Sequence, residues 1–372
     1  MKDDKKTGRI FSVGGGKGGV GKSIFSISLG MSLVEKGFKV VIADLDLGTA
    51  NLHTYIGITK KTPTLADFIL KKLSSLDDII VETSEKNLGL ISGAEFVPGM
   101  ANPAHWMKLK MMRHLKSLTA DFVIIDLGAG VHFNTLDFFG ISDRGFVVTA
   151  PEPGAVMNAY VFIKGAFFRK LQNVFSKHPE IGPLIESEIK KTETEKSFTL
   201  EWFSARVREI DPEMLPLIDE IENSFRPALV VNRTTECGTP ILVKNLITLC
   251  TQKFGITLEY VGNLPDVRTI THYLLNLPKF YDTPHGRPFF DSVRHIVDRL
   301  DIPGDELKDI EDLRDDFSDE EIEELIGFIE TLDDSVFEGT SKKLLQLRMY
   351  FKPSDVLNFL IGRGITHDLF YI

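Results

Sequence analysis

A glycine-rich stretch near the start of the chain holds two lysines and a serine at fixed spacing: Gly14-Gly15-Gly16-Lys17-Gly18-Gly19-Val20-Gly21-Lys22-Ser23. Its last eight residues fit the pattern G-x-x-x-x-G-K-[ST], which is typical of loops that bind nucleotide phosphates. Glycines let the backbone curl so that successive N–H groups point at phosphate oxygens. The ammonium of Lys22 would reach the β- and γ-phosphates, and the hydroxyl of Ser23 would ligate Mg²⁺. The pattern therefore predicts a phosphate site formed by Gly16, Lys17, Gly18, Gly19, Val20, Gly21, Lys22 and Ser23.

The segments on either side of this loop have the order that such a site requires. Residues 9–13 (RIFSV) form a short apolar run that predicts a buried strand leading into the loop. Residues 24–35 carry apolar side chains at helical spacing, and Gly37 is a suitable helix cap. The positive end of that helix would point at the same anion. Because strand, loop and helix occur together, a glycine-rich turn that binds no phosphate is the weaker alternative.

Two apolar runs further along the chain, FKVVIAD and FVIID, end in Asp44 and Asp126. In an open parallel sheet the ligand lies beyond the carboxyl ends of the strands, so both carboxylates are expected to face the phosphates. We assign Asp44 to the water shell of Mg²⁺ and Asp126 to the same ion, through water. The predicted metal site is thus Ser23, Asp44 and Asp126. Taken alone, Asp44 and Asp46 could instead cap the turn that follows them, and that alternative stays open.

Several strings of residues resemble one superfamily. Lys17 occupies the second position of the loop pattern, and K-G-G-x-G-K-S resembles the deviant phosphate loop of the MinD/ParA/Mrp superfamily. The string D-x-D-x-G-x-x-N-L, which begins at Asp44, resembles MinD and its flagellar relative FlhG. D-x-G-A-G from Asp126, and T-x-P-E-P from Thr149, resemble the FlhG/FleN branch more closely than MinD proper or ParA. The resemblance covers residues 9 to about 300.

The resemblance implies roles for individual residues. In that family the lysine at the Lys17 position reaches across a dimer interface to the partner's nucleotide. The aspartate at the Asp46 position orients the attacking water. Leu127, not a glutamate base, follows Asp126 in this chain, which supports Asp46 in that role. The family's catalytic residues therefore fall on Lys17, Lys22 and Asp46.

The base of the nucleotide is expected at the ends of two later strands. The run ALVVN ends in Asn232, and the family's asparagine at this position recognises the edge of adenine. The string NLPD, which ends in Asp266, resembles the loop that closes over the base. The resemblance therefore implies ATP or ADP with Mg²⁺ as cofactors. The implied base contacts are Asn232, Arg233, Pro265 and Asp266.

The expected fold is α/β: a doubly wound, mostly parallel sheet of the P-loop NTPase type over residues 1–300. Between a helix and the next strand, residues from about 170 to 226 exceed the usual connection by roughly fifty residues. Helical patterning at 200–210 and 214–225 indicates a helical insertion, which we expect next to the nucleotide as a candidate lid or partner surface. A solvated packing excursion is the alternative. Residues 301–372 are expected to form a small acidic helical C-terminal extension.

Charge is distributed unevenly along the chain. The net charge is −10, but residues 301–372 alone hold 7 Lys/Arg and 19 Asp/Glu, so the remainder is close to neutral at +2. Nucleic acid is not an expected partner, because phosphate contacts need clustered basic side chains. Residues 342–352 are basic and rich in leucine, which makes them a candidate membrane-contacting helix. Their acidic neighbours would repel anionic lipid, so a membrane surface is the weaker expectation.

Cysteine usage and hydropathy bear on location. Cys237 and Cys250 are the only cysteines, and they show neither zinc-site spacing nor a disulfide framework. No run of 18 apolar residues occurs, and the first predicted strand starts too early for an export segment to precede it. A cytoplasmic protein is expected, with peripheral association at the membrane or a cell pole as a further expectation.

Three functions remain in view. The motifs favour a slow, Mg²⁺-dependent ATPase that converts ATP and water to ADP and phosphate and forms a homodimer when ATP is bound. As a switch, it would act with a protein partner to set the position or number of a machine at a flagellum, pole or division site. A ParA-type partitioning ATPase and an ATP-binding scaffold with little turnover are the alternatives.

Overall fold

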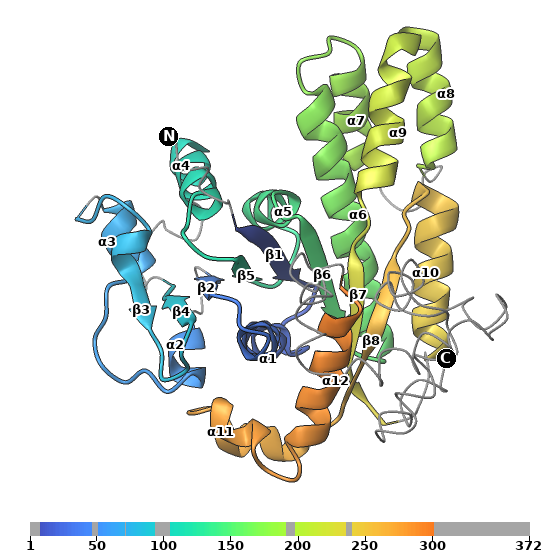
Figure 1. Ribbon diagram of the computed structural model, residues 1–372. Coiled ribbons are helices and arrows are strands. Elements are labelled where there is room, and N and C mark those ends of the chain that lie inside the picture. The colour runs from blue at the N-terminus through green and yellow to red at the C-terminus, as the bar shows by residue number, and fades with distance from the viewer. Residues whose placement is uncertain are drawn as a thin grey trace, which may run out of the picture. The chain divides into compact units, whose positions relative to one another are not determined.

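The computed structural model describes residues 8–46, 51–70, 72–93, 105–190, 198–235 and 240–300 (Figure 1). Apart from its last three residues, this part of the chain belongs to one compact unit, Met1–Val297. The expected acidic extension, the candidate membrane helix and Cys237 all lie outside the described residues. None of the helices in the described ranges is long and apolar enough to cross a membrane.

An eight-stranded sheet forms the centre of the unit, in the order β3-β4-β2-β5-β1-β6-β7-β8. The β3–β4 pair is antiparallel, and all other neighbouring strands run parallel. The strands are β1 Arg9–Gly14, β2 Val40–Leu45, β3 Ile80–Glu82, β4 Leu88–Ile91, β5 Phe122–Leu127, β6 Arg144–Thr149, β7 Ala228–Thr234 and β8 Glu259–Pro265. Every residue of β2 and β5 is buried, as expected for parallel strands that are covered on both faces. The predicted α/β fold with a mostly parallel sheet is confirmed.

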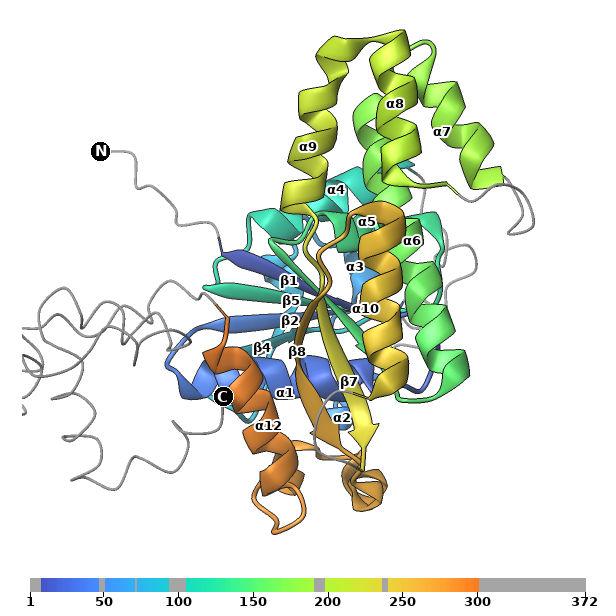
Figure 2. The ribbon, with the colours of Figure 1, turned by 90° about the vertical axis from the view of Figure 1, so that its right-hand side faces the viewer.

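Helices cover both faces of this sheet. The helices α1, α11 and α12 lie on one face, and α4, α5, α6 and α10 lie on the other (Figures 1 and 2). Their bounds are α1 Lys22–Glu35, α2 Leu52–Tyr55, α3 Leu65–Ile69, α4 His105–Lys116, α5 Phe133–Gly140, α6 Pro153–Phe175, α10 Ile241–Phe254, α11 Pro278–Tyr281 and α12 Arg287–Asp298. Short 3₁₀ helices occur at Asp77–Ile79, Pro212–Met214 and Arg268–Tyr273.

The predicted insertion is helical, but it does not lie next to the phosphate loop. It contains α7 Ile181–Lys190, α8 Leu200–Ile210 and α9 Leu215–Ser224. The helix α6 begins at the carboxyl edge of the sheet, after β6, and runs 23 residues toward the opposite edge. Residues inserted between the end of α6 and the start of β7 must therefore lie at the amino edge, as Figures 1 and 2 show. The expectation of a lid over the nucleotide is wrong for α7–α9.

An aromatic cluster holds the insertion against α6 and α10. The rings of Phe168 and Phe198 have centroids 4.5 Å apart, and those of Phe175 and Phe203 are 6.2 Å apart. Phe254 of α10 lies 6.2 Å from Phe198. All five rings are buried, and each contributes on the order of 2 kcal/mol through burial alone. The insertion is therefore a packed part of the unit and not a solvated excursion.

Candidate functional site

The phosphate loop connects β1 to α1 in a conformation that depends on glycine. Gly19 and Gly21 adopt positive φ angles of 75° and 99°, a region that residues with a side chain rarely enter. Gly21 is also the N-cap of α1. Because glycine has no side chain to cap the first N–H groups of α1, these groups can donate to a bound anion.

Close packing fixes the loop from two sides. A Cβ atom at Gly16 would lie 1.9 Å from the carbonyl oxygen of Asn158 in α6, and one at Gly21 would lie 2.1 Å from the Nδ2 of Asn232. A Cβ at Gly18 would meet no atom within 4 Å. Glycine is thus required for packing at two of these positions but not at the third.

This difference gives a matched pair of substitutions. Gly16→Ala is expected to lower the free energy of unfolding by about 2 kcal/mol, because the loop or α6 has to shift. It should also weaken nucleotide binding at least tenfold. Gly18→Ala should change neither quantity appreciably. Urea unfolding and calorimetric titration with ADP and Mg²⁺ measure both effects, and equal behaviour of the two variants would show that the loop is not held as described.

Lys22, the first residue of α1, is a buried cation. It is 8% exposed, and its ammonium donates to the carbonyl oxygen of Lys17 at 3.5 Å. Burial lowers the pKa of Lys22, although the charges of Asp126 and Asp46 oppose this shift. A desolvated ammonium with only a long hydrogen bond to a carbonyl has much to gain from a phosphate oxygen.

Asp44 and Asp126 lie at paired positions of the neighbouring strands β2 and β5, and each is 1% exposed. Asp126 accepts hydrogen bonds from the hydroxyls of Ser23 and Ser26, both at 2.7 Å. Asp44 accepts from the backbone N–H groups of Asp46 and Leu52, both at 3.1 Å. Burial, with a smaller effect from the neighbouring Asp126, raises the pKa of Asp44 to about 7. Burial likewise raises the pKa of Asp126 to about 6.

These residues fit Mg²⁺ bound together with a nucleotide. Two buried carboxylates beside the Ser23 hydroxyl form the oxygen-only donor set that this ion prefers. A positive ion there would relieve the burial that raises both pKa values. Within the described ranges, no group of three or more acidic, histidine or cysteine side chains is arranged to hold a metal by itself. Phosphate oxygens and water would therefore have to supply the remaining ligands.

The raised pKa of Asp126 makes a stability prediction for the nucleotide-free protein. The pKa of this carboxyl rises from 3.8 to about 6 on folding, so the native state binds a proton that the unfolded state has already released between these pH values. The free energy of unfolding of the protein therefore falls as the pH rises from about 4 to about 6. Asp126→Asn removes this cost: one of the Ser23 and Ser26 hydroxyls can go on donating to the amide oxygen, and the other can rotate to accept from the amide nitrogen. The variant should be more stable than the wild type by about 1–3 kcal/mol at pH 8, and by less at pH 5. Urea unfolding without Mg²⁺ at both pH values tests this, and a variant that is less stable at pH 8 would refute it.

Asp46 lies near the loop and next to the segment that follows β5. A Cβ atom at Gly128 would come within 3.3 Å of the Asp46 Oδ1. The charge of Asp46 acts to raise the pKa of both Lys22 and Asp126. The Asp46 carboxylate is thus in the same neighbourhood as the phosphate-binding lysine and the predicted metal site.

Lys17 differs from the other charged residues of the loop, because its side chain is 45% exposed. Its ammonium forms an ion pair of 3.3 Å with Glu152, the N-cap of α6, which is itself 54% exposed. Such a solvated pair is worth at most about 1 kcal/mol, so Lys17 can leave it easily. No sequence pattern indicated the pairing of Lys17 with Glu152.

A cavity of about 280 Å³ lies beside the loop. It brings Asn232, Arg233, Pro265 and Asp266, which were assigned to the base, together with Gly19, Gly21 and Ser23 of the loop. Seven further lining residues were not anticipated, since nothing in their type or spacing marks them: Ile24, Tyr55, Val267, Ile270, Thr271, Leu274 and Phe289.

Two of the predicted base-contacting residues hold the loop itself. The Nδ2 of Asn232 donates to the carbonyl oxygen of Val20 at 2.8 Å, and its Oδ1 accepts from the N–H of Arg233. The guanidinium of Arg233 donates to the carbonyl oxygen of Gly19 at 2.7 Å. Arg233 has a φ of 59°, which is unusual for a residue with a long side chain. Each polar atom of the Asn232 amide thus makes one hydrogen bond to the protein, and its second N–H and second oxygen lone pair are the groups that a base could bind.

A phosphate loop between a strand and a helix, at the carboxyl edge of an open and mostly parallel sheet, defines the chain as a P-loop NTPase. Comparison with known proteins narrows this class. Residues 6–174 match the model of the ParA family described as NUBPL iron-transfer P-loop NTPase. Over this part, the chain is similar to proteins of the ParA/MinD family.

Curated relatives include proteins of flagellar and division-site systems. The chain is 34% identical over 173 residues to the flagellum site-determining protein YlxH of Helicobacter pylori, which covers 44% of this chain and 55% of that protein. It is 29% identical over 164 residues to the antiactivator FleN of Pseudomonas aeruginosa (42% and 55%). It is 29% identical over 153 residues to the septum site-determining protein MinD of Thermotoga maritima (41% and 56%). The chain spans about half the length of the curated relatives it matches.

Solved structures with the same fold cover more of the chain. The cell division ATPase MinD of Pyrococcus furiosus has a TM-score of 0.52 at 19% identity, over 78% of this chain and 98% of that one. MinD of Pyrococcus horikoshii, in complex with Mg-ADP, has a TM-score of 0.52 at 19% identity, over 78% and 96%. At this identity the likeness supports the fold alone.

Proposed function

We propose that this protein is a Mg²⁺-dependent ATPase that acts as a switch: it binds ATP, pairs with a second copy of itself, and separates after slow hydrolysis. The observation that carries the proposal is the convergence of the buried Lys22, the hydroxyl of Ser23 and the buried carboxylates of Asp44 and Asp126 at one edge of the sheet. This is the set of groups that phosphoryl transfer requires, because its catalysis consists mainly of positioning and charge stabilisation.

Each residue has a defined task in this proposal. The loop N–H groups and Lys22 would hold the phosphates, Ser23 would ligate the Mg²⁺ ion, and Asp44 and Asp126 would hold that ion through its water shell. Mg²⁺, when bound, would neutralise charge that develops on the phosphate oxygens. The Asp46 carboxylate orients the attacking water as a hydrogen-bond acceptor. Asn232, Arg233, Pro265 and Asp266 bound the cavity that would receive the base.

Lys17 is proposed to act on the partner's nucleotide. Among the described residues, its exposed ammonium pairs with the solvent-exposed Glu152 alone, so it is available to a second subunit that covers this edge. Lys17→Ala should therefore retain ATP binding but lose ATP-dependent dimerisation and at least 90% of turnover. Analytical ultracentrifugation with ATP or ADP, combined with phosphate release, tests this. A variant that still dimerises and turns over ATP like the wild type would overturn the assignment.

The output of the switch is proposed to be spatial. Relatives named for flagellum site determination and septum site determination support a role in setting the position or number of a cellular machine through a protein partner. We would use Asp46→Ala, in which the ATP-bound state should persist, to recover partners from the native lysate with ATP or ADP. Flagellar or polar proteins enriched only with ATP would support the proposal, whereas DNA or a centromere-binding protein would favour a partitioning ATPase. Equal recovery with both nucleotides would favour a scaffold.

The domain division is likewise a proposal. Residues 1–300 would form the ATPase domain and 301–372 an acidic extension that regulates it or contacts the partner. The compact unit Met1–Val297 ends close to this boundary, which supports it.

A further inference from the structure

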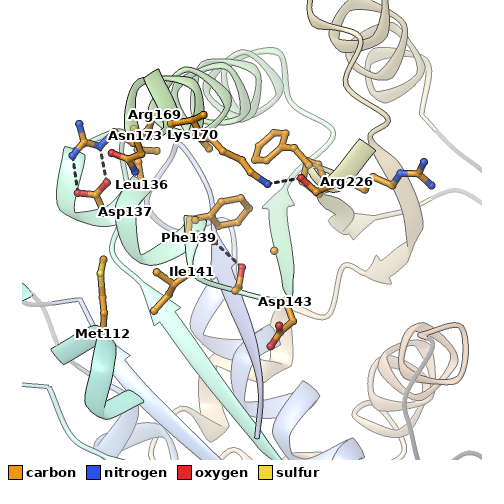
Figure 3. A pocket seen from close by; sticks show the side chains of 18 of the residues that line it. Met112, Leu136, Asp137, Phe139, Ile141, Asp143, Arg169, Lys170, Asn173 and Arg226 are labelled. Atoms are coloured by element: carbon orange, nitrogen blue, oxygen red, sulfur yellow. Dashed lines mark hydrogen bonds and ion pairs between the residues drawn. The ribbon is translucent and has the colours of Figure 1, made fainter. Parts of the chain in front are cut away.

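A second cavity lies at the amino edge of the sheet, opposite the phosphate loop. It has a volume of about 460 Å³ and is bounded by α4, α5, α6 and the segment that leads from α9 into β7 (Figure 3). We call it the amino-edge pocket and define it by Lys108, Leu109, Asp137, Arg169, Lys170 and Val174. None of the residues assigned to the nucleotide lines it.

Cations outnumber carboxylates on one side of this pocket. Asp137 is buried and forms ion pairs with both Lys108 and Arg169, the latter through two nitrogens at 2.6 and 3.0 Å (Figure 3). The single negative charge of Asp137 thus faces the positive charges of two side chains. These interactions keep the pKa of Asp137 below its usual value even though burial favours the opposite shift. A net positive charge remains on this wall.

Lys170 of α6 and Arg226, which follows α9, add two more cations to the lining. The ammonium of Lys170 donates to the hydroxyl of Ser224 at 2.8 Å, and burial lowers its pKa, partly offset by the charge of Glu220. Arg226 also lines the pocket and is exposed, and its guanidinium points away from Lys170 (Figure 3). In the described part of the chain, neither Lys170 nor Arg226 forms an ion pair with a carboxylate.

One further carboxylate borders the pocket, but it is engaged elsewhere. Asp143 accepts a hydrogen bond of 2.7 Å from the backbone N–H of Ile10. It anchors the start of β6 to β1 and faces the floor of the pocket, away from the α6 cations (Figure 3). The pocket therefore favours an anionic occupant on its α6 side.

The rim of the pocket is apolar. Leu109 of α4 is 44% exposed and Val174 of α6 is 43% exposed, and both line the opening. Met112 and Ile141 also line the pocket and are partly buried. On α4, Trp106 is 54% exposed and lies one helical turn before Leu109, on the same face. A small anion inside the pocket would leave these rim side chains in water, so the complementary occupant has to extend over the rim.

We propose that the amino-edge pocket docks a protein segment that presents carboxylates beside apolar side chains. The carboxylates would pair with Lys170 and Arg226, and the apolar side chains would cover Leu109, Met112 and Val174. Charge complementarity and the exposed apolar rim select this class of partner. A flat bilayer is a poorer match, because the cations and apolar groups line the walls of a concavity and do not share one outer plane.

The test uses the full-length protein with labelled methyl groups and a synthetic probe. The probe is a blocked 16-residue peptide with glutamates and leucines at helical spacing. It should shift the methyl signals of Leu109, Met112, Ile141 and Val174 with saturation, and added salt should weaken the binding. The double variant Lys170→Gln/Arg226→Glu should lower the affinity at least tenfold. Lys177→Glu, at an exposed position outside the pocket, should lower it less than twofold.

Control peptides decide between this proposal and non-specific association. Replacing glutamates by lysines, or leucines by serines, should abolish the shifts. The proposal is overturned if the lysine peptide binds equally well, if the double variant binds like the wild type, or if phosphatidylserine vesicles bind and the acidic peptide does not. Nucleotide binding and the urea midpoint of the double variant should match the wild type, which excludes misfolding as the cause.

Discussion

Replacing Lys22 with methionine is expected to remove ATP binding without destabilising the fold. The variant should bind ATP at least 100-fold more weakly, because it loses a charged hydrogen bond to the phosphates in a partly desolvated site. Its nucleotide-free form should be as stable as the wild type, or more stable by about 1 kcal/mol. The reason is that burial, the largest influence on the Lys22 pKa, already disfavours the charged ammonium. Methionine fills a similar volume without that charge.

Calorimetric titration with ATP and Mg²⁺, and urea unfolding without nucleotide, measure the two quantities. Lys17→Met is the matched control: it removes a lysine of the same loop that is exposed, and a single subunit should still bind ATP within about threefold of the wild-type affinity. ATP affinity within threefold of wild type in Lys22→Met would mean that the phosphates bind elsewhere.

Asp46→Ala is expected to separate binding from hydrolysis. The carboxylate lies beside Gly128 and close to the predicted metal site, yet it is not a proposed ligand of the phosphates or of Mg²⁺. Turnover should fall about 100-fold, as when a group that positions a reacting water is removed. ATP affinity should change by less than about fivefold.

The proposed switch also predicts the oligomeric state of this variant. With ATP, Asp46→Ala should remain dimeric for many wild-type turnover times, and with ADP it should behave like the wild type. Single-turnover phosphate release and sedimentation velocity measure the two effects. Asp46→Asn, which keeps the size but not the charge of the side chain, should behave similarly. Wild-type turnover in both variants would refute the role of Asp46. Undiminished ATP binding in the same variants would show that the substitution had not damaged the phosphate site.

The sequence predicted those parts of the fold that depend on local patterns. Apolar runs ending in Asp44 and Asp126 are strong signals, because parallel strands are buried on both faces and their carboxyl ends share one edge. The same rule places Asn232 and Asp266 at this edge, and both residues line the cavity beside the loop. These predictions need only the order of strands and helices along the chain.

Other features depend on long-range contacts that no local pattern contains. The insertion was expected beside the nucleotide, and its actual position follows from the length and direction of α6, which carry the chain to the opposite edge. The bonds from Asn232 and Arg233 to the carbonyl oxygens of Val20 and Gly19 join residues more than 200 positions apart. Tyr55 lines the cavity, but it belongs to no motif that would have marked it in the sequence.

The length of α6 gives it a mechanical consequence. Its first turns touch the phosphate loop, where the backbone of Asn158 packs on Gly16, and its last turn is embedded in the aromatic cluster of the insertion. A 23-residue helix is about 35 Å long, so a tilt of about 3° around the loop would displace its far end by about 2 Å. A tilt of α6 about its contact with the loop would therefore move the insertion more than it moves the loop. A motion too small to change the sheet could be amplified into a visible displacement of α7, α8 and α9.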